Sequence, residues 1–415
     1  MPNKFHKLLK SEVLVYNAGL KGYEIFNINT GKLRNVFEHD TNNVNTTSMP
    51  YIIRAAVSSD GTKAYVADGQ DPYMRIIDLL TGKYLSNPSL GPGMSVKVLR
   101  LSHDGTELAV GFGAASYLYQ YDTTTLIRRA LPVVKPTGTI YSISYSKDDS
   151  KIAAGHLTAP FLTIYDRASM VKYNIPVVPT SRVNCSEFSP NGSLFACGSE
   201  SSAYFFLYNT SDWTLIATAA PVANPINDIH FSPNGQRIGC LAFSATSTTL
   251  FRYYDIVSST WITADFTGLP LAIDNYIGNN SPNFAWLDND TIVIFGAVSA
   301  GMQSSTNQVI YSFISNTVTD VLTLPLTINY GCAHHPLVLR KLSGTVANAG
   351  GTGLARTVRA YHRDTGELIG ETVSNAQNGI FEMKVFESDP LIVMSVGQGT
   401  EVTEIFDSVV SAPWP

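Results

Sequence analysis

The stretch SPNGSLFACG at residues 189–198 decides the fold, because it places a tight turn between two short apolar runs. It recurs as SPNGQRIGCL at 232–241, and earlier in the chain as SSDGTKAYVA at 58–67, SHDGTELAVG at 102–111 and SKDDSKIAAG at 146–155. The turn residues recur every 43 or 44 residues, at Asp60, Asp104, Asp148, Asn191 and Asn234. Apolar runs joined by such turns predict antiparallel hairpins.

A second hairpin motif keeps nearly the same period. It reads FNINTG, IIDLLTG, YDTTT, YDRAS, YNTSD and YDIVS, with its polar residue at Asn27, Asp78, Asp122, Asp166, Asn209 and Asp255. A proline near the end of each later unit marks the end of an outer edge strand, since proline cannot donate to a ladder. These prolines are Pro132, Pro176, Pro221, Pro270 and Pro325. Each unit therefore predicts four antiparallel strands, the signature of a propeller blade.

The number of innermost strands predicts seven blades. These strands begin near Tyr51, Ser95, Thr139, Arg182, Ile226, Ser281 and Ile328. The segment from Glu12 to Phe37 supplies three strands without an innermost partner, so residues 327–336 are expected to complete that blade. Pairing of the two ends in this way removes free strand edges. We expect an all-β chain with a seven-bladed propeller over residues 1–338.

The period, the SPNG and SxDG turns and the YD/ID-xx-TG hairpins resemble those of WD-repeat and YVTN-type β-propellers. The Gly-His and Trp-Asp pairs of true WD repeats are absent. The resemblance covers about four-fifths of the chain, and it implies a fold but no particular activity.

After Pro336 the period is lost, and residues 339–415 predict a second domain of six or seven strands, a small Ig/transthyretin-like β-sandwich. It resembles the carboxypeptidase-regulatory and transthyretin-like modules through Ser343–Val346, Arg359–Tyr361, Thr365–Leu368 and Asn378–Phe381. The run LARTVRAYHRDTGELIGETVS resembles the version found in structural proteins of tailed bacteriophages, which implies attachment or display. The short linker predicts that this module lies close to the propeller.

Composition excludes several function classes. Only 15% of the 415 residues are charged, well below the usual quarter, and the net charge is −5. This charge provides no general attraction to nucleic-acid backbones, and no stretch is long enough for membrane insertion. The N-terminal apolar run is too short for a signal peptide, and four cysteines make no disulfide scaffold. We expect a soluble protein made in a reducing cytoplasm.

Long connections concentrate on one predicted face of the propeller, at Glu38–Pro50, Asp265–Ser281 and Ala297–Gln308. Loop length concentrated over a regular scaffold predicts a binding face for a partner or a glycan, and tolerated insertions are the equally weighted alternative. The candidate contact residues are Asn42, Asn43, Met49, Tyr73, Tyr276, Asn279, Asn280, Met302, Gln303 and Asn307. Trp414 is a candidate docking residue in the C-terminal tail, for which disorder is the alternative.

Most candidate chemistry has a structural explanation. Adjacent His334 and His335 point to opposite faces of a predicted strand, and His103 and His230 are expected to be satisfied or exposed. If the SPNG hairpin is centred between Ser189 and Ser193, Cys185 faces Cys197 across it. A strained disulfide is then possible, and buried reduced thiols are favoured.

The remaining acidic and glycine-rich stretches are expected to be turns. Asp288–Asp290 and Asp148–Asp149 occupy hairpin positions, and Gly350–Gly353 predicts a flexible hairpin without a phosphate-binding fingerprint. Asp228 could face the axial channel, but no ring of acids accompanies it in the other blades. No metal site and no cofactor is predicted.

Together these features predict a non-enzymatic structural component of a tailed-phage virion, in the tail, fibre or appendage. Its expected partners are other virion structural proteins in an oligomeric assembly, and a host surface receptor or glycan. A bacterial propeller scaffold or adhesin is the alternative, and a propeller hydrolase or lactonase is a third.

Overall fold

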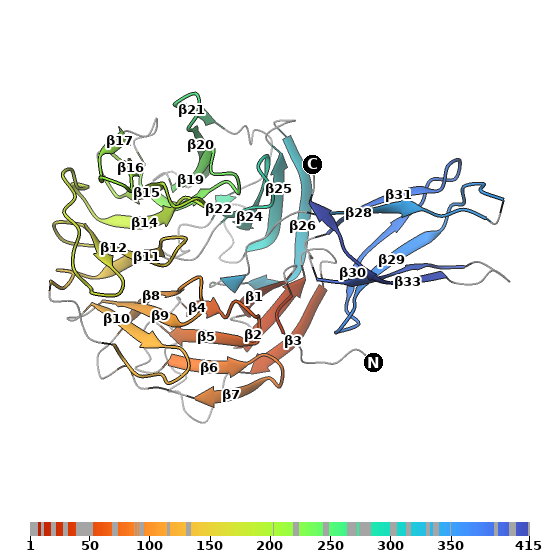
Figure 1. The fold of residues 1–415 in the computed structure, drawn as a ribbon, viewed down its shortest axis with the longest axis horizontal. Helices are drawn as coiled ribbons and strands as arrows, with labels where there is room; N and C mark the ends of the chain where they lie inside the picture. The colour runs from red at the N-terminus through yellow and green to blue at the C-terminus, as the bar shows by residue number, and fades with distance from the viewer. Residues whose placement is uncertain are drawn as a thin grey trace.

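The computed structural model describes residues 7–9, 12–17, 22–27, 32–38, 53–68, 74–86, 88, 90, 95–113, 117–129, 134–201, 203–218, 224–243, 249–263, 272–273, 284–298, 305–312, 317–328, 333–334, 340–348, 350–385, 389–397 and 404–413. In these ranges every regular element is a β-strand, and the chain has an all-β propeller fold. Seven antiparallel sheets lie around a common axis, and two further sheets extend to one side (Figure 1).

Blades 1 to 4 contain the strands up to β13. Blade 1 has the order β27-β1-β2-β3, with bounds Ala333–His334, Glu12–Asn17, Gly22–Asn27 and Lys32–Glu38. Blade 2 contains β4 to β7, at Ile53–Val57, Lys63–Asp68, Met74–Asp78 and Lys83–Ser86. Blade 3 contains β8 to β10, at Val96–Leu101, Glu107–Phe112 and Leu118–Asp122. Blade 4 contains β11 to β13, at Ile140–Tyr145, Lys151–His156 and Leu162–Asp166.

Blades 5 to 7 complete the propeller. Blade 5 contains β14 to β17, at Val183–Phe188, Leu194–Ser199, Phe205–Asn209 and Leu215–Thr218. Blade 6 contains β18 to β21, at Ile226–Phe231, Arg237–Phe243, Thr249–Asp255 and Thr260–Thr263. Blade 7 contains β22 to β26, at Ala272–Ile273, Phe284–Trp286, Thr291–Val298, Ser305–Ser312 and Thr317–Ile328.

The repeated turn motif has one local geometry, which explains its recurrence. In blade 3 the Ser102 hydroxyl donates to the Asp104 carboxylate at 2.6 Å and accepts the Glu107 backbone N–H at 3.0 Å. Asp104 accepts the Thr106 backbone N–H at 2.9 Å, and Gly105 between them has φ of 69°. Side chains of Ser, Asp or Asn thus satisfy the backbone of a turn that requires a positive φ at its fourth position.

The blades stack through apolar side chains that meet close to glycine. A Cβ atom added at Gly155 would lie 2.5 Å from Val183 of the next blade, and one added at Gly198 would lie 2.6 Å from Ile226. Val183 and Ile226 are fully buried in clusters that join neighbouring blades. Close approach of consecutive sheets therefore requires glycine at this step of the second strand.

The sheets after the propeller form a module of their own. One has the order β31-β28-β34, at Ile380–Val385, Arg340–Thr345 and Ala412–Pro413. The other has the order β30-β29-β32-β33, at Leu368–Val373, Thr357–His362, Leu391–Ser395 and Glu404–Val409. Both sheets contribute to one hydrophobic cluster that includes Leu342, Phe381, Val358 and Val393.

The N-terminal segment joins this C-terminal module to the propeller. Leu8 is buried in a cluster with the first two blades, and its backbone N–H donates to the Gly61 carbonyl at 2.7 Å. The next residue, Leu9, is buried in the cluster of the C-terminal module. The Lys7 ammonium lies 2.7 Å from the Asp389 carboxylate of that module. Adjacent leucines therefore enter two different cores.

Six of the predicted inner strands begin within three residues of their expected positions. The seventh, expected from near Ile328, is β27 at Ala333–His334, because Ile328 still belongs to β26; β27 pairs with β1, with Leu14 opposite Ala333. Two further details differ. In the described part of blades 3 and 4 the fourth strand is reduced to single bridges, Tyr121 with Arg128 and Tyr165 with Lys172. Pro325 lies within β26 rather than at its end, at the register shift between the pairs Ser305–Ile328 and Asn307–Thr323, and a bulge in an outer strand tolerates proline.

The predicted register of the SPNG hairpin is wrong by one residue. The turn closes between Ser189 and Leu194 rather than Ser193, which places Cys185 opposite Gly198 and Cys197 opposite Ser186. The two cysteines are free and buried, so they do not form the cross-strand disulfide that the assumed register allows. Burial raises the pKa of both thiols, which keeps them protonated.

Candidate functional site

Most of the predicted loop-face residues lie outside the described residues. These are Asn42, Asn43, Met49, Tyr73, Tyr276, Asn279, Asn280, Met302, Gln303 and Trp414. Asn307 is described only as part of a strand, since β24 continues to Val298 and β25 begins at Ser305. The expected long loop from Ala297 to Gln308 is thus shorter, because its two ends pair, with Ala297 opposite Asn307.

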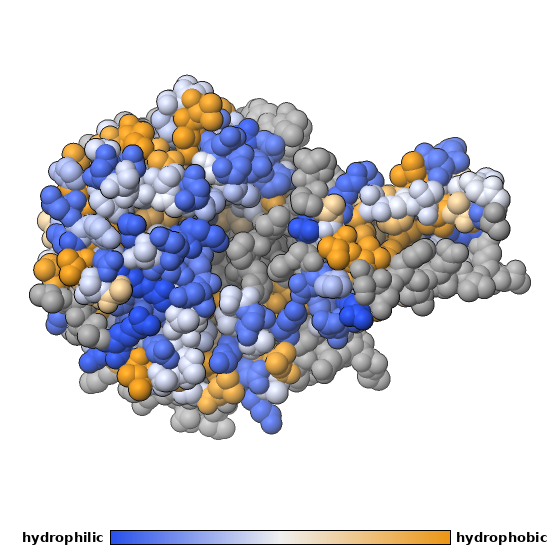
Figure 2. Space-filling model, in the orientation of Figure 1, coloured by the Kyte–Doolittle hydropathy of each residue, from blue (hydrophilic) through white to orange (hydrophobic). Residues whose placement is uncertain are grey.

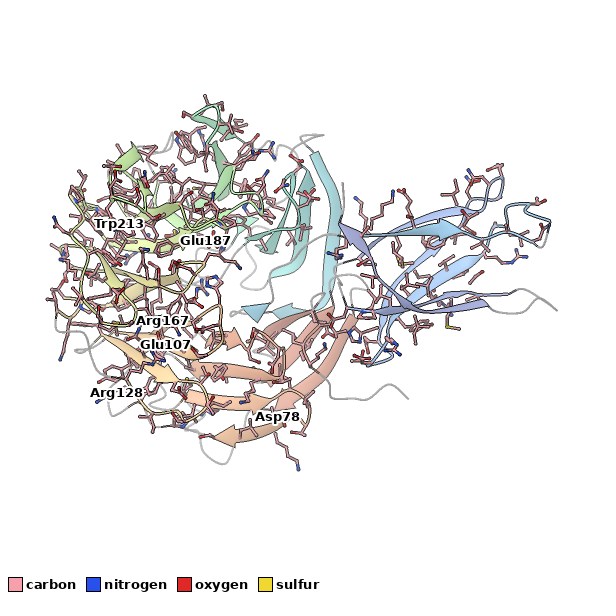
Figure 3. All side chains as sticks on the ribbon, in the orientation of Figure 1. Asp78, Glu107, Arg128, Arg167, Glu187 and Trp213 are labelled. Carbon is pink, nitrogen blue, oxygen red and sulfur yellow. The ribbon has the colours of Figure 1, made fainter. Side chains whose placement is uncertain are left out.

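A polar pocket lies against the inner strands of four consecutive blades. β8, β11, β14 and β18 all contribute, and the lining residues that matter here are Arg100, Tyr141, Asn184, Asn227, Asp228 and His230. Figure 3 shows Glu187 at the inner strands and Trp213 farther from the axis. On the face seen in Figure 2, hydrophilic side chains gather around the inner part of the disc. This pocket is the candidate functional site.

The repeat explains why these side chains meet. Each of four neighbouring inner strands has a polar residue two positions before the serine that begins its turn: Arg100, Ser144, Glu187 and His230. Equivalent positions on consecutive blades face the same axis, so the sequence period itself brings them together. The sequence reasoning considered Asp228 and His230 but missed Arg100 and Glu187, which an alignment of the repeats against one another would have shown.

His230 is held between two carboxylates. Its Nδ1 lies 3.1 Å from Glu187 Oε1, and its Nε2 lies 3.1 Å from Asp228 Oδ1. Burial alone would lower the pKa of His230, but the charges of Asp228 and Glu187 outweigh it and raise the pKa to about 10. The imidazole is therefore a cation, with Nδ1 hydrogen-bonded to Glu187 and Nε2 within ion-pair distance of Asp228.

The same carboxylates, of Glu187 and Asp228, also connect neighbouring blades through hydrogen bonds from backbone N–H groups. Glu187 Oε2 accepts the Phe231 backbone N–H of the next blade at 2.5 Å. Asp228 Oδ2 accepts the Phe284 backbone N–H at 3.3 Å, and its Oδ1 accepts the Ile229 backbone N–H at 3.1 Å. These acids therefore act as hydrogen-bond acceptors for the framework around the pocket.

Amide side chains form a second polar layer of the pocket. The Asn184 amide nitrogen donates to Asn227 Oδ1 at 2.9 Å, and Asn184 Oδ1 accepts from Arg182 Nε at 2.7 Å. The Arg182 guanidinium also lies over the Tyr141 ring, 4.5 Å from its centroid, and pairs with Glu200 at 3.0 Å. This layer fixes Asn227 and Tyr141 at the pocket wall.

Arg100 differs from the other charged residues of the pocket. Within the described part of the chain, its guanidinium makes no hydrogen bond and no ion pair, although the Asp228 and Glu187 carboxylates lie near enough to interact by charge. Burial lowers the pKa of Arg100, and these carboxylates oppose that effect. A guanidinium remains charged in proteins, so Arg100 brings a cation with N–H donors to the pocket wall.

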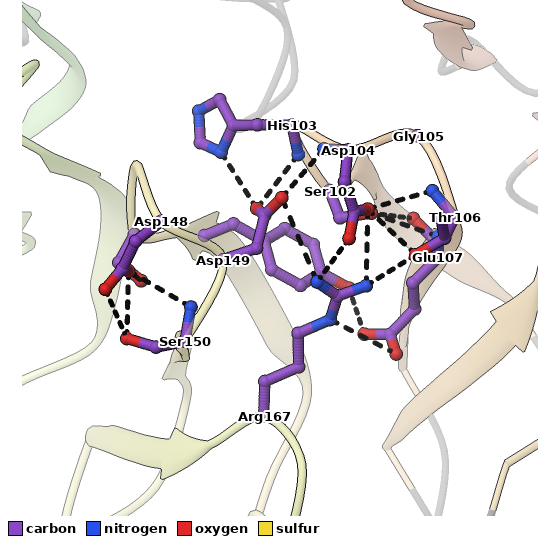
Figure 4. A network of polar contacts seen from close by, with 12 residues as sticks. Ser102, His103, Asp104, Gly105, Thr106, Glu107, Asp148, Asp149, Ser150 and Arg167 are labelled. Carbon is purple, nitrogen blue, oxygen red and sulfur yellow. Dashed lines mark hydrogen bonds and ion pairs between the residues drawn. The ribbon is translucent and has the colours of Figure 1, made fainter.

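A second charged cluster lies between blades 3 and 4 (Figure 4). Arg167 Nη1 lies 2.9 Å from Asp104 Oδ2 and 3.8 Å from Asp149 Oδ2, and Arg167 Nε lies 3.6 Å from Glu107 Oε2. Glu107 is fully buried and accepts the Tyr145 hydroxyl at 2.6 Å. Burial alone would raise the pKa of Asp104, but hydrogen bonds from Arg167 and from its own turn lower it.

The turn at Asp148–Asp149 does more than its sequence position predicts. Asp148 caps its own turn through Ser150, as expected. Asp149 has φ of 54°, where the other turns have glycine, and its carboxylate accepts the backbone N–H groups of His103 and Asp104 at 2.9 and 2.7 Å. A strained position for a non-glycine residue thus serves an inter-blade contact.

The other candidates lie where the sequence places them. His103 is a turn residue whose Nδ1 contacts Asp149 at 2.9 Å. Asp288–Asp290 is a turn, and its backbone and side chains are bound by Arg237 and Asn234 of blade 6. Gly350–Gly353 lies in a hairpin closed by a bridge between Ala347 and Gly353. His334 belongs to β27, and the side chains of His334 and His335 are not among those described.

Among the residues with described positions, no three His, Cys, Asp or Glu side chains are grouped as metal ligands. The same residues contain no helix of the length and apolarity required to span a membrane.

Comparison with known proteins agrees with the propeller. The repeat described as "WD domain, G-beta repeat" matches residues 176–206, which contain the SPNG hairpin of blade 5. No curated protein matches the chain. These findings support a WD-repeat β-propeller.

Solved structures show the same fold at low sequence identity. A functionally unknown protein from Desulfotomaculum acetoxidans DSM 771 is 15% identical with a TM-score of 0.60, over 79% of this chain and 99% of its own. A chain of a mitotic checkpoint complex is 13% identical with a TM-score of 0.53, over 71% of this chain and 86% of its own. At such identities the likeness concerns the propeller architecture alone.

Proposed function

We propose that this protein is a non-enzymatic structural component of a tailed-phage virion, in the tail, fibre or appendage. The propeller is a rigid platform that binds other virion proteins, a host receptor or a glycan. The C-terminal module, as a carboxypeptidase-regulatory or transthyretin-like β-sandwich, attaches or displays it. Virion localisation follows after synthesis in the host cytoplasm.

The main observation in support of this proposal is the packed connection between the propeller and the C-terminal module. Leu8 and Leu9 are each at most 2% exposed and enter the cores of the propeller and of the C-terminal module, respectively. Such a joint transmits the orientation of one module to the other, as an attached platform requires. The carboxylates around the axis support the non-enzymatic part, because Glu187 and Asp228 hold backbone N–H groups of the next blades.

The resemblance to phage structural modules supplies the virion context. The run LARTVRAYHRDTGELIGETVS, residues 354–374, forms the hairpin of β29 and β30, with Gly366 at φ of 71° in its turn. The exposed ends of this module carry apolar side chains, Val373 at 64% and Ile380 at 50% exposure. Apolar side chains at an exposed sheet end suit attachment to a neighbouring protein.

Mass spectrometry of gradient-purified phage particles, quantified against the major capsid protein, tests the proposal. We expect a fixed copy number that is a multiple of three, six or twelve. Absence of the protein from particles would overturn the virion function and favour a bacterial scaffold.

A variant pair tests the role of the C-terminal module. The full chain with Val373→Asp and Ile380→Asp should be incorporated into particles at least tenfold less than the wild type. Val257→Asp, at an even more exposed apolar position of the propeller (77%), is the control and should be incorporated normally. Equal incorporation of both variants contradicts attachment through this module.

A further inference from the structure

The axial pocket contains one strong donor group whose acceptor is missing from the described part of the chain. Glu187 and Asp228 use their oxygens on His230 and on backbone N–H groups. Among the residues that the structure describes, the Arg100 guanidinium has no such partner, although it lines the same pocket. A half-buried guanidinium with free donors is a recognition group for a planar anion, which it binds through two parallel hydrogen bonds.

The neighbouring groups decide which anion suits the pocket. Asp228 and Glu187 lie close enough to Arg100 to interact with it by charge, and they would repel a phosphate dianion. A carboxylate carries one charge, and the His230 cation on the far side of those acids limits the repulsion. The Asn227 side chain at the wall offers a further amide N–H, because its oxygen already accepts from Asn184.

The size of the pocket limits the kind of molecule that can bear this carboxylate. The cavity volume is about 20 Å³, which is room for one small functional group. A carboxylate fixed directly to a sugar ring would require the ring to enter as well. A carboxylate at the end of a flexible methylene stem, as in aspartate or glutamate, reaches such a site alone.

We propose that Arg100 forms an axial subsite that receives an acidic side chain of a partner protein. The proposal deepens the proposed function, on which it rests for the existence of a protein partner at the propeller axis. The carboxylate binds the guanidinium, and Asn227 and Tyr141 contact the polypeptide or stem beside it. The subsite thereby selects an acidic residue at one position of the partner.

Titration of the full chain with N-acetyl-glutamate N-methylamide, followed by NMR or calorimetry, tests the subsite without any virion. We expect saturable binding with a millimolar Kd, and at least tenfold weaker binding of the N-acetyl-glutamine N-methylamide isostere. Arg100→Gln should weaken the glutamate compound at least tenfold. Arg100→Lys should give an intermediate loss, since a lysine retains the charge but not the two-pronged geometry.

Arg359→Gln is the matched control, because Arg359 is an exposed arginine paired with Glu371 on the C-terminal module. It should leave the Kd unchanged within twofold, and thermal melts should show that each variant is folded. Equal binding of the glutamate and glutamine compounds, or no effect of Arg100→Gln, would overturn the subsite. Tighter binding of glucuronate than of the glutamate compound would overturn the protein partner in favour of an acidic sugar.

The two proposals can fail separately. Absence from phage particles with intact, Arg100-dependent glutamate binding would reject the virion function alone. Presence in particles without glutamate binding would reject the subsite alone.

Discussion

Arg167 and Arg100 belong to neighbouring blades, and they differ in what surrounds their guanidinium groups. Arg167 lies between the turns of blades 3 and 4, where three carboxylates, of Asp104, Glu107 and Asp149, face it. Arg100 lies at the axis and has no hydrogen-bond acceptor among the described residues. The same residue type therefore has two roles: Arg167 holds two blades together through ion pairs, and Arg100 has N–H donors available for a ligand.

Desolvation explains why this difference matters. A buried charge is tolerated when partners replace its water, and Glu107 has four such contacts, from Gln120, Tyr145, Arg129 and Arg167. Removal of one partner from such a cluster leaves the others uncompensated. An axial guanidinium that has no bonded partner among the described residues breaks no such contact when it is removed, so its removal should cost the fold little.

The largest effect should follow from Glu107→Ala. Loss of this fully buried carboxylate leaves the Tyr145 hydroxyl and the Gln120 amide without their acceptor. We expect the free energy of unfolding to fall by about 3–5 kcal/mol, the usual effect of breaking a buried pair. Urea unfolding followed by tryptophan fluorescence measures it.

Glu371→Ala is the control for that prediction, because the Arg359–Glu371 pair is about half exposed on both sides. The change there should stay below about 1 kcal/mol. A similar loss at both positions would mean that burial does not distinguish the two kinds of pair.

The pH dependence of stability should show how much the ion pairs of His230 with Asp228 and Glu187 stabilise the propeller. The pKa of His230 is raised from 6.5 to about 10, so its contribution to stability is complete below pH 6.5 and is lost as the pH rises through 10. We expect the wild type to lose on the order of 2 kcal/mol more than His230→Gln between pH 6.5 and 10. The test is to measure the unfolding free energy of both proteins across that pH range. The same pH dependence in both would contradict the pairing of His230 with Asp228 and Glu187.

The sequence predicts the fold well because the fold depends on a period. The turn serines and the Asp or Asn residues at each repeat satisfy the turn backbone locally, so the same letters give the same hairpin in each blade. The register of the SPNG hairpin was not predictable in this way. It depends on which two residues close the turn, and closure between Ser189 and Leu194 places Cys185 opposite Gly198 instead of Cys197.

The candidate site was less predictable for a related reason. Loop length pointed to residues of which only Asn307 is described, and that residue lies in a strand. Arg100 and Glu187 belong to regular strands, and each looks unremarkable within its own blade. They lie near His230 because they occupy equivalent positions on inner strands of the propeller. Identifying them as site residues therefore requires a comparison of the repeats together with the three-dimensional arrangement of the blades.

The smallest effect should come from Arg100→Gln, and this prediction separates the two arginines most directly. We expect the free energy of unfolding to change by less than about 0.5 kcal/mol, because no described residue forms a hydrogen bond or ion pair with this guanidinium. The same substitution at Arg167, which is 11% exposed, should cost at least about 2 kcal/mol. Chemical unfolding of both variants at neutral pH and moderate salt gives the two values.

The outcome at Arg100 bears on binding as well as on stability. A stable Arg100→Gln protein that no longer binds the glutamate compound would show that the residue is retained for recognition rather than for the fold. A loss at Arg100 as large as that at Arg167 would instead make its charge part of the framework around Asp228 and Glu187. The donors that we assign to a partner would then be needed by the propeller itself.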